Sequence, residues 1–207
     1  MKTANTEQAI LQAAEEMFLE KGFAMVSTTD IANKVGCNQA MVHYYYRTKE
    51  NLFMKVFTNK IDTLFKTFSN IIKTEHSLFD RITITIDNYF ELFQNNPRIP
   101  FLVVNELILN PTRRKYMRDY IINSSISDFY YEFDRQVAKE IKMGNIRKIT
   151  TFDLLQNIIS LTAFAFVCSP VLEDVLTESK FSLEDYFQHR NVEIKTLIIQ
   201  GLRPMQK

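Results

Sequence analysis

Turn-forming residues are scarce in this sequence, and this is the feature that most restricts how the chain can fold. Of its 207 residues only four are Gly and five are Pro, whereas 17 are Phe and nine are Tyr. An all-β fold needs many short hairpins, and Gly and Pro supply most of their turns. A chain of this length buries a substantial core in one or two domains. The composition therefore predicts an all-α protein.

The same scarcity argues against several kinds of catalytic and cofactor site. The Gly residues stand too far apart for a phosphate-binding loop, and no G-x-S-x-G motif is present. The two cysteines, Cys37 and Cys168, follow no metal-ligand spacing, and neither do His76 and His189. We therefore expect no catalytic residues, no metal and no cofactor.

The start of the chain shows no apolar targeting segment, which together with the two isolated cysteines favours a reducing cytoplasm. Residues 154–172 carry no charge and approach the roughly 20 residues of a membrane span. This stretch also contains Gln156, Asn157 and Pro170. We expect a helix that is buried in the protein or at a subunit contact, and no membrane partner.

Apolar periodicity and capping residues divide the chain into helices. Three helices end near Gly22, Gly36 and Tyr45, with Asn38 as the cap of the third. Further helices are expected at about 49–73, 77–95, 99–109, 111–142, 151–168 and 182–202. The 49–73 helix is expected to connect two domains, 4–64 and 65–207.

Residues 27–46 have the pattern of a helix-turn-helix motif. Ala32 is small enough for two helices to cross closely, Gly36 permits the turn, and Val42 supplies the apolar contact of the second helix. At 100° per residue the second helix has two faces. Gln39, Ala40, His43 and Tyr44 lie on one side, and Met41, Val42, Tyr45 and Tyr46 lie on the other. The first set is predicted to enter the major groove of DNA, where Gln39 pairs with adenine and His43 and Tyr44 donate to phosphates or bases.

The distribution of charge agrees with a local nucleic-acid site. The whole chain carries a net charge of only +1. Residues 28–60 contain five Lys or Arg against two Asp or Glu, whereas residues 1–27 contain two Lys against four Glu. The basic charge is thus confined to the segment that would face DNA.

Many residues of the N-terminal segment agree, in order and without gaps, with one known family. They are Ile10-Leu11, Ala13-Ala14, Phe18, Glu20-Lys21-Gly22-Phe23, Thr28, Asp30-Ile31-Ala32, Gly36, Tyr45-Tyr46, Lys49-Glu50 and Leu52. Over residues 4–64 the chain resembles the DNA-binding domain of TetR-family transcriptional regulators. The resemblance implies that the rest is a variable helical domain that binds a small-molecule effector and forms a homodimer.

The family's DNA contacts can be carried over residue by residue. Thr28 and Lys49 resemble phosphate contacts, Gln39 and Ala40 occupy base-reading positions, and Asn38 stands at the capping position. Tyr45 is left open, since the family places a phosphate contact there but the helical projection turns it inward. The predicted DNA-binding set is Thr28, Asn38, Gln39, Ala40, His43, Tyr44, Tyr45 and Lys49. The family usually has Tyr at the position of His43, and Gly is common at the position of Ala40. These two differences affect the operator sequence that the resemblance implies.

Aromatic residues on the later helices predict an effector pocket with mostly apolar walls. The predicted lining is Tyr89, Phe90, Phe93, Phe101, Asn105, Phe129, Phe133 and Phe164. The alternative for each residue is an ordinary place in the core. Arg113, Arg114 and Lys115 are expected in a solvated turn, with a role at an acidic partner as the alternative.

Helices 151–168 and 182–202 are rich in apolar residues and are expected to form the contact of a homodimer. The dimer would present two reading helices to a palindromic double-stranded operator. The leading hypothesis is a repressor that a mostly apolar effector releases from DNA, and an activator fits the sequence equally. The competing hypothesis is a helical ligand-binding protein or enzyme that no longer acts through DNA.

Overall fold

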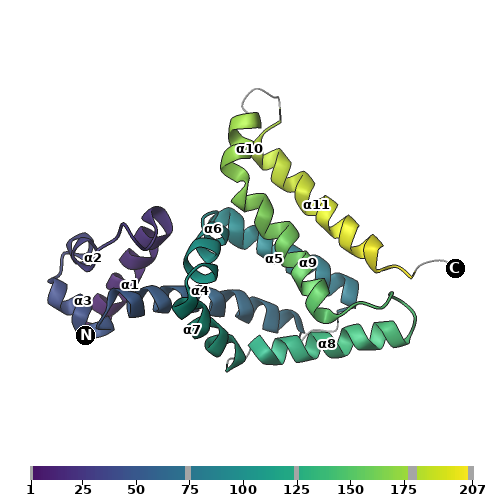
Figure 1. Cartoon of the computed structure of the whole chain (residues 1–207), viewed down its shortest axis with the longest axis horizontal. Coiled ribbons are helices and arrows are strands. Elements are labelled where there is room, and N and C mark those ends of the chain that lie inside the picture. Colours follow the sequence, from purple (N-terminus) through teal and green to yellow (C-terminus); the bar gives the residue numbers. More distant parts are fainter. Residues whose placement is uncertain (1, 73–75, 124–125, 177–180, 205–207) are drawn as a thin grey trace. The chain divides into compact units, whose positions relative to one another are not determined.

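The computed structural model describes residues 2–72, 76–123, 126–176 and 181–204, and the regular structure within these ranges is entirely helical (Figure 1). The all-α prediction is confirmed. The chain divides into two compact units, one of Met1–Thr63 with Leu102–Met117 and one of Leu64–Phe101 with Arg118–Lys207. The functional division at residue 64 remains a prediction.

The first unit begins with a compact group of helices, α1 (Lys2–Lys21), α2 (Thr28–Val35) and α3 (Gln39–Tyr46), followed by α4 (Lys49–Ile72). The predicted last residue of α4, Lys73, lies outside the described residues. The core contains Phe18 and Phe53, whose rings meet edge to face with centroids 5.2 Å apart. Ile31 and Val42 of α2 and α3 are also buried, so the apolar stripe of each helix faces one shared core.

Local interactions explain where α2 and α3 begin. The Ser27 hydroxyl accepts a hydrogen bond from the Asp30 backbone N–H at 3.1 Å, and the Asp30 carboxylate accepts one from the Ser27 backbone N–H at 3.0 Å. Gly36 then ends α2 at φ 74°, a conformation that side chains disfavour. Asn38 caps α3 as predicted, since its Oδ1 accepts a 3.0 Å hydrogen bond from the Ala40 N–H.

The second unit is a helical bundle in which α5 (Leu78–Asn95), α9 (Thr151–Val167) and α11 (Leu183–Leu202) pack on one another (Figure 1). The Phe166 ring lies at the centre of this packing. Its centroid is 5.5 Å from that of Phe90 and 5.4 Å from that of Phe93, and it stacks on Phe187 at 4.3 Å. Ser182 forms the predicted capping box of α11 with Asp185.

The helices between these groups differ from the prediction. Residues 111–142 form two helices, α7 (Pro111–Ile122) and α8 (Ile126–Lys142), so the prediction of one long helix is wrong. The last turn of α7 contains neither Gly nor Pro, and beside it the Nδ2 of Asn123 donates to the Asp119 carbonyl at 2.7 Å. The predicted 99–109 helix is α6 (Ile99–Leu102) followed by a π-helix, η1 (Val103–Ile108).

A short helix, α10 (Ser169–Leu176), was not predicted, because Pro170 suggested a stop. Pro is tolerated in the first turn, where a backbone N–H has no helical acceptor. Within the described ranges, no helix taken singly has the length and apolar character to cross a membrane. Helices α9 and α10 meet that test only together, as a pair bent by 53°.

Candidate DNA-binding site

Helix α3 has one exposed face and one buried face, as the helical projection predicts. Gln39, Ala40, His43 and Tyr44 are exposed, and we call these four residues the α3 face. On the other side Val42 is 1% and Tyr46 8% exposed. Tyr45 is half-buried, with its ring edge-on to that of Tyr44 at 5.1 Å. A short helix supported from behind and exposed in front has the form needed to enter a DNA groove.

Two of the predicted contact residues hold each other in place. The Nε2 of Gln39, the first residue of α3, donates a 2.9 Å hydrogen bond to the Oγ1 of Thr28, the first residue of α2. The same Nε2 lies 3.5 Å from the Nε2 of His43. The protein itself therefore holds the amide of Gln39 in one orientation.

The His43 ring also supports the end of α3. Its Nδ1 lies 3.0 Å from the Arg47 carbonyl oxygen, which can only accept, so Nδ1 carries the proton. In the neutral ring Nε2 is then an acceptor, and donation to a phosphate requires the protonated ring. Arg47 itself has φ 62° and ψ −47°, and the Thr48 N–H donates to the Tyr46 carbonyl across it at 2.7 Å. This is a strained three-residue turn.

Tyr46 is a packing residue, in agreement with its buried position. Its hydroxyl donates to the Glu7 carbonyl at 3.3 Å and so ties α3 to α1. Burial is the main reason that the pKa of Tyr46 rises to about 12. The hydroxyl therefore stays protonated and can donate throughout the physiological pH range.

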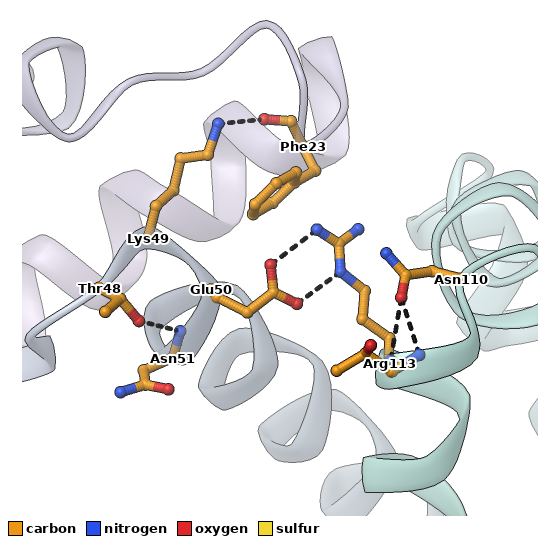
Figure 2. Close-up of polar contacts among 8 residues, drawn as sticks. Phe23, Thr48, Lys49, Glu50, Asn51, Asn110 and Arg113 are labelled. Carbon is orange, nitrogen blue, oxygen red and sulfur yellow. Dashed lines mark hydrogen bonds and ion pairs between the residues drawn. The ribbon is translucent and has the colours of Figure 1, made fainter.

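Lys49, a predicted phosphate contact, turns two of its three donors toward the protein, and Figure 2 shows the one that binds Phe23. Its Nζ donates to the Phe23 carbonyl at 2.9 Å and to the Val26 carbonyl at 2.8 Å. The ammonium also lies 4.1 Å from the centroid of the Phe23 ring. Lys49 thus fixes the α1–α2 connection to the start of α4, and one N–H remains for a phosphate.

Arg113 is the main residue of this unit that the sequence interpretation missed. The expectation of a solvated turn is wrong for Arg113, which is 4% exposed. It makes a two-pronged ion pair with Glu50, at 2.6 Å from Nε to Oε1 and 2.9 Å from Nη2 to Oε2 (Figure 2). Its guanidinium lies 3.8 Å from the Phe23 centroid. The pair satisfies the charge, which explains why burial is tolerated.

Ion pairs with α1 neutralise part of the positive charge of residues 28–60. Lys34 binds Glu16 at 2.6 Å and Lys60 binds Glu15 at 2.5 Å. The hydrogen bond from Lys34 is the largest cause of the lowered pKa of Glu16. The acidic residues of the first helix therefore reduce the basic character of two cations that the sequence assigned to the DNA-facing segment.

A sequence profile of a known family covers this site. The profile described as "Bacterial regulatory proteins, tetR family" matches residues 10–56, which include α2, α3 and the start of α4. The chain belongs to the TetR family. It is 25% identical to the HTH-type transcriptional regulator QacR of Staphylococcus aureus, over 74% of this chain and 89% of that protein.

Solved structures share the TetR-family fold. The regulator FadR from Bacillus subtilis, in complex with stearoyl-CoA, is 18% identical with a TM-score of 0.71 and covers 95% of this chain and 99% of its own. A putative transcriptional regulator from Saccharomonospora viridis, in complex with choline, is 17% identical with a TM-score of 0.73 and covers 98% of this chain and all of its own. The fold of these regulators therefore extends over 95% or more of this chain.

The predicted effector-pocket residues fall into two groups. Tyr89, Phe90 and Phe93 of α5 and Phe129 and Phe133 of α8 are buried in the second unit. Phe101 is 57% and Phe164 67% exposed, so neither faces the interior of that unit. Asn105 lies in η1, within the first unit, and is half-buried. Burial of the Tyr89 hydroxyl raises its pKa, which keeps this side chain neutral.

Proposed function

We propose that this protein is a homodimeric transcriptional repressor that binds a palindromic operator and is released from it by a small, mostly apolar effector. The observation that carries the DNA-binding part is the α3 face, whose four side chains are exposed while Val42 and Tyr46 behind them are buried. The Gln39–Thr28 hydrogen bond adds a base-reading amide that is already oriented. Such a regulator acts on the chromosome, so the proposal implies a cytoplasmic protein.

The test is selection of DNA duplexes from a random-sequence pool, followed by fluorescence anisotropy with the selected duplex. We expect a palindrome, a Kd in the range of about 10⁻⁸ to 10⁻¹¹ M, and affinity that falls steeply with salt. Gln39→Ala should weaken binding by about five- to 150-fold. Gln94→Ala, which removes an exposed amide from α5, is the matched control. Failure to select any duplex would contradict the proposal and favour the competing ligand-binding protein or enzyme.

Dimerisation through α9 and α11 is supported by their exposed apolar side chains. Phe152 and Phe164 of α9 are 65% and 67% exposed, and Val192 and Leu197 of α11 are 59% and 52% exposed. Apolar side chains of this size mark an interface when they cluster on neighbouring elements, and α9 packs on α11. A symmetric dimer would place two α3 helices about one turn of DNA apart.

An effector site in the second unit is supported by two buried polar groups. The Thr162 hydroxyl is fully buried, and the Nδ2 of Asn88 is buried as well. Within the part of the chain that the structure describes, neither atom has a hydrogen-bond partner. An unpaired buried polar group is costly unless a ligand or water satisfies it. Together with the buried aromatic residues of α5 and α8 in the same unit, these groups fit a mostly apolar molecule with one or two polar atoms.

Thermal shift assays with three chemical classes would test this site: a long-chain acyl-CoA, its free fatty acid, and a quaternary ammonium compound. The first and last are the ligand classes of the FadR and Saccharomonospora viridis structures. An effector should raise the Tm and release the selected duplex. Thr162→Val should weaken the response, whereas Ser160→Ala, which alters an exposed hydroxyl of α9, should not.

A further inference from the structure

Arg113 joins two helices that lie far apart in the sequence. It is the third residue of α7, and its partner Glu50 is the second residue of α4 (Figure 2). The Asn110 Oδ1 accepts hydrogen bonds from the backbone N–H groups of Thr112 and Arg113, each at 3.1 Å, so the start of α7 is itself capped. A guanidinium that chelates a carboxylate through two bonds fixes both the separation and the angle of the helices that carry them.

The surroundings of the Arg113–Glu50 pair leave it little freedom. The guanidinium carbon lies 3.8 Å from the centroid of Phe23 and 4.6 Å from that of Phe53. Among the residues with described side chains, Arg113 is the one charged residue that is buried. Because a buried arginine without a partner is strongly disfavoured, the helices are stable in the arrangement that keeps the pair intact.

The pair reaches the predicted DNA contacts through short connections. Glu50 follows Lys49 directly, and the Lys49 ammonium holds the carbonyls of Phe23 and Val26. The next residue, Ser27, caps α2, and Thr28 after it holds Gln39 of the α3 face. Arg113 therefore contacts the Phe23 ring and, through Glu50, the start of α4. Lys49 joins both of these to the segment that leads into the helix-turn-helix motif.

Helices α4 and α7 both continue beyond the first unit. That unit takes α4 as far as Thr63 and α7 as far as Met117, whereas the helices end at Ile72 and Ile122. The Arg113–Glu50 pair joins these two helices near their N-terminal ends, within the first unit.

We propose that Arg113 is a positioning residue for DNA binding: through Glu50 and Phe23 it fixes the start of α7 to the helices that carry the α3 face. If the start of α7 moves, the α3 face then moves with it, because the contacts of Arg113 keep α7 from shifting relative to the helices that carry that face. The proposal rests on the proposed DNA-binding function and names the contact that sets the position of the α3 face. Loss of the pair would loosen the α3 face relative to the rest of each protomer.

The test measures how the affinity for DNA depends on the spacing between the two half-sites. The probe is the palindromic duplex that the wild-type protein selects, together with versions that carry one or two extra base pairs at the centre. One extra base pair moves a half-site by about 3.4 Å and turns it by about 34°. The wild-type dimer should lose about tenfold or more in affinity on the lengthened duplex. Arg113→Met should bind the original duplex more weakly but discriminate between the duplexes by less than about threefold.

Three further variants make the test independent of folding defects. Arg113→Lys keeps the charge and loses the two-pronged geometry, and Glu50→Gln keeps the shape and loses the charge, so both should relax the spacing dependence in part. Arg114→Met is the matched control, because Arg114 is exposed and donates to the Ile108 carbonyl at 2.9 Å. A protein that is merely destabilised loses affinity for every duplex by the same factor, since only its folded fraction falls.

The proposal is overturned if Arg113→Lys and Glu50→Gln retain the wild-type spacing profile, whatever their absolute affinity. If the wild-type protein selects no duplex, the proposed DNA-binding function fails and this inference falls with it. If the wild-type protein selects a duplex and only the Arg113 and Glu50 variants lose spacing dependence, both stand.

Discussion

The side-chain amide of Gln39 donates a 2.9 Å hydrogen bond to the hydroxyl of Thr28, so the first residues of α3 and α2 are joined on the exposed side of the helix-turn-helix. Thr28→Val keeps the shape of the side chain but frees the amide. We expect base discrimination at the position read by Gln39 to fall by about 1 kcal/mol, or about fivefold. Competition binding with single-base variants of the selected duplex measures this.

Thr29→Val is the control for this prediction, because Thr29 is exposed and adjacent. The double variant Thr28→Val/Gln39→Ala should lose no more discrimination than Gln39→Ala alone. Additive losses would show that the two residues contact DNA independently.

Lys49 is expected to contribute both to stability and to phosphate binding. Lys49→Met leaves the carbonyls of Phe23 and Val26 without their charged donor, which should destabilise the protein by roughly 1–3 kcal/mol. It should also reduce the slope of log affinity against log salt concentration by about 0.9, since one phosphate contact is lost. Lys55→Met, an exposed site on α4, is the comparison. An unchanged slope would make Lys49 a purely structural residue.

Replacement of Arg47 by glycine should remove the backbone strain of the turn at this residue. At φ 62° a side chain is disfavoured, so Arg47→Gly should be more stable than Arg47→Ala by about 1 kcal/mol. Both variants lose the same charge, and their DNA affinities should fall by similar factors. Urea denaturation and anisotropy measure the two effects separately. Equal stability of Gly and Ala at this position would show that the turn carries no strain.

Three capping boxes make the stability of the folded protein depend on pH in the acid range. The carboxylates of Asp30, Asp80 and Asp185 each accept a 2.6 Å hydrogen bond from the serine hydroxyl three residues earlier. That bond is the main reason that the pKa of each lies below its ordinary value of 3.8. A pKa that is lower in the folded state stabilises the protein above the unfolded pKa, and this stabilisation is lost as pH falls through the folded pKa.

The Tm, followed by circular dichroism, should therefore fall as the pH drops below about 4, the ordinary pKa of Asp, and toward the lowered pKa values of the folded protein. Asp185→Asn should flatten part of that fall and lower the Tm at pH 7. Glu184→Gln alters the neighbouring carboxylate in the first turn of α11 and serves as the control. Identical pH profiles for Asp185→Asn and the wild-type protein would refute the contribution of this cap.

Charged residues on the exposed faces of α9 and α11 should separate the proposed dimer. Phe164→Glu and Leu197→Glu each bring a carboxylate close to its symmetric copy or to an apolar partner, and the double variant should sediment as a monomer at micromolar concentration. Tyr131→Glu, at a site of α8 that is 68% exposed, is the control and should leave the dimer intact. A wild-type protein that sediments as a monomer would contradict the interface at once.

Periodicity and capping chemistry explain why the sequence predicted the helix-turn-helix so well. Val42 and Tyr46 lie behind the α3 face because four residues advance a helix by about one turn. The cap by Asn38 depends on a residue only two positions away. Interactions between residues two to four positions apart depend only on the local sequence, so they can be predicted without knowledge of the tertiary structure.

Arg113 could not be found in this way. Its partner Glu50 lies 63 residues earlier, and a run of three basic residues resembles a solvated helix start. The end of α7 carries no such signal either, because neither Gly nor Pro stands beside Ile122 in the sequence. Phe164 was assigned to the pocket by its apolar character alone, and that character fits an exposed interface equally well.

The grouping of Leu102–Met117 with the N-terminal helices bears on how such regulators can be recombined. A chimera made by cutting after residue 64 would carry Glu50 and the ring of Phe23 into a new protein while leaving their arginine behind. In the chimera, Glu50 would then need a cation from the host protein to replace Arg113. A graft that transfers two segments, the helix-turn-helix region and the start of α7, keeps the native contact and should swap operator preference cleanly.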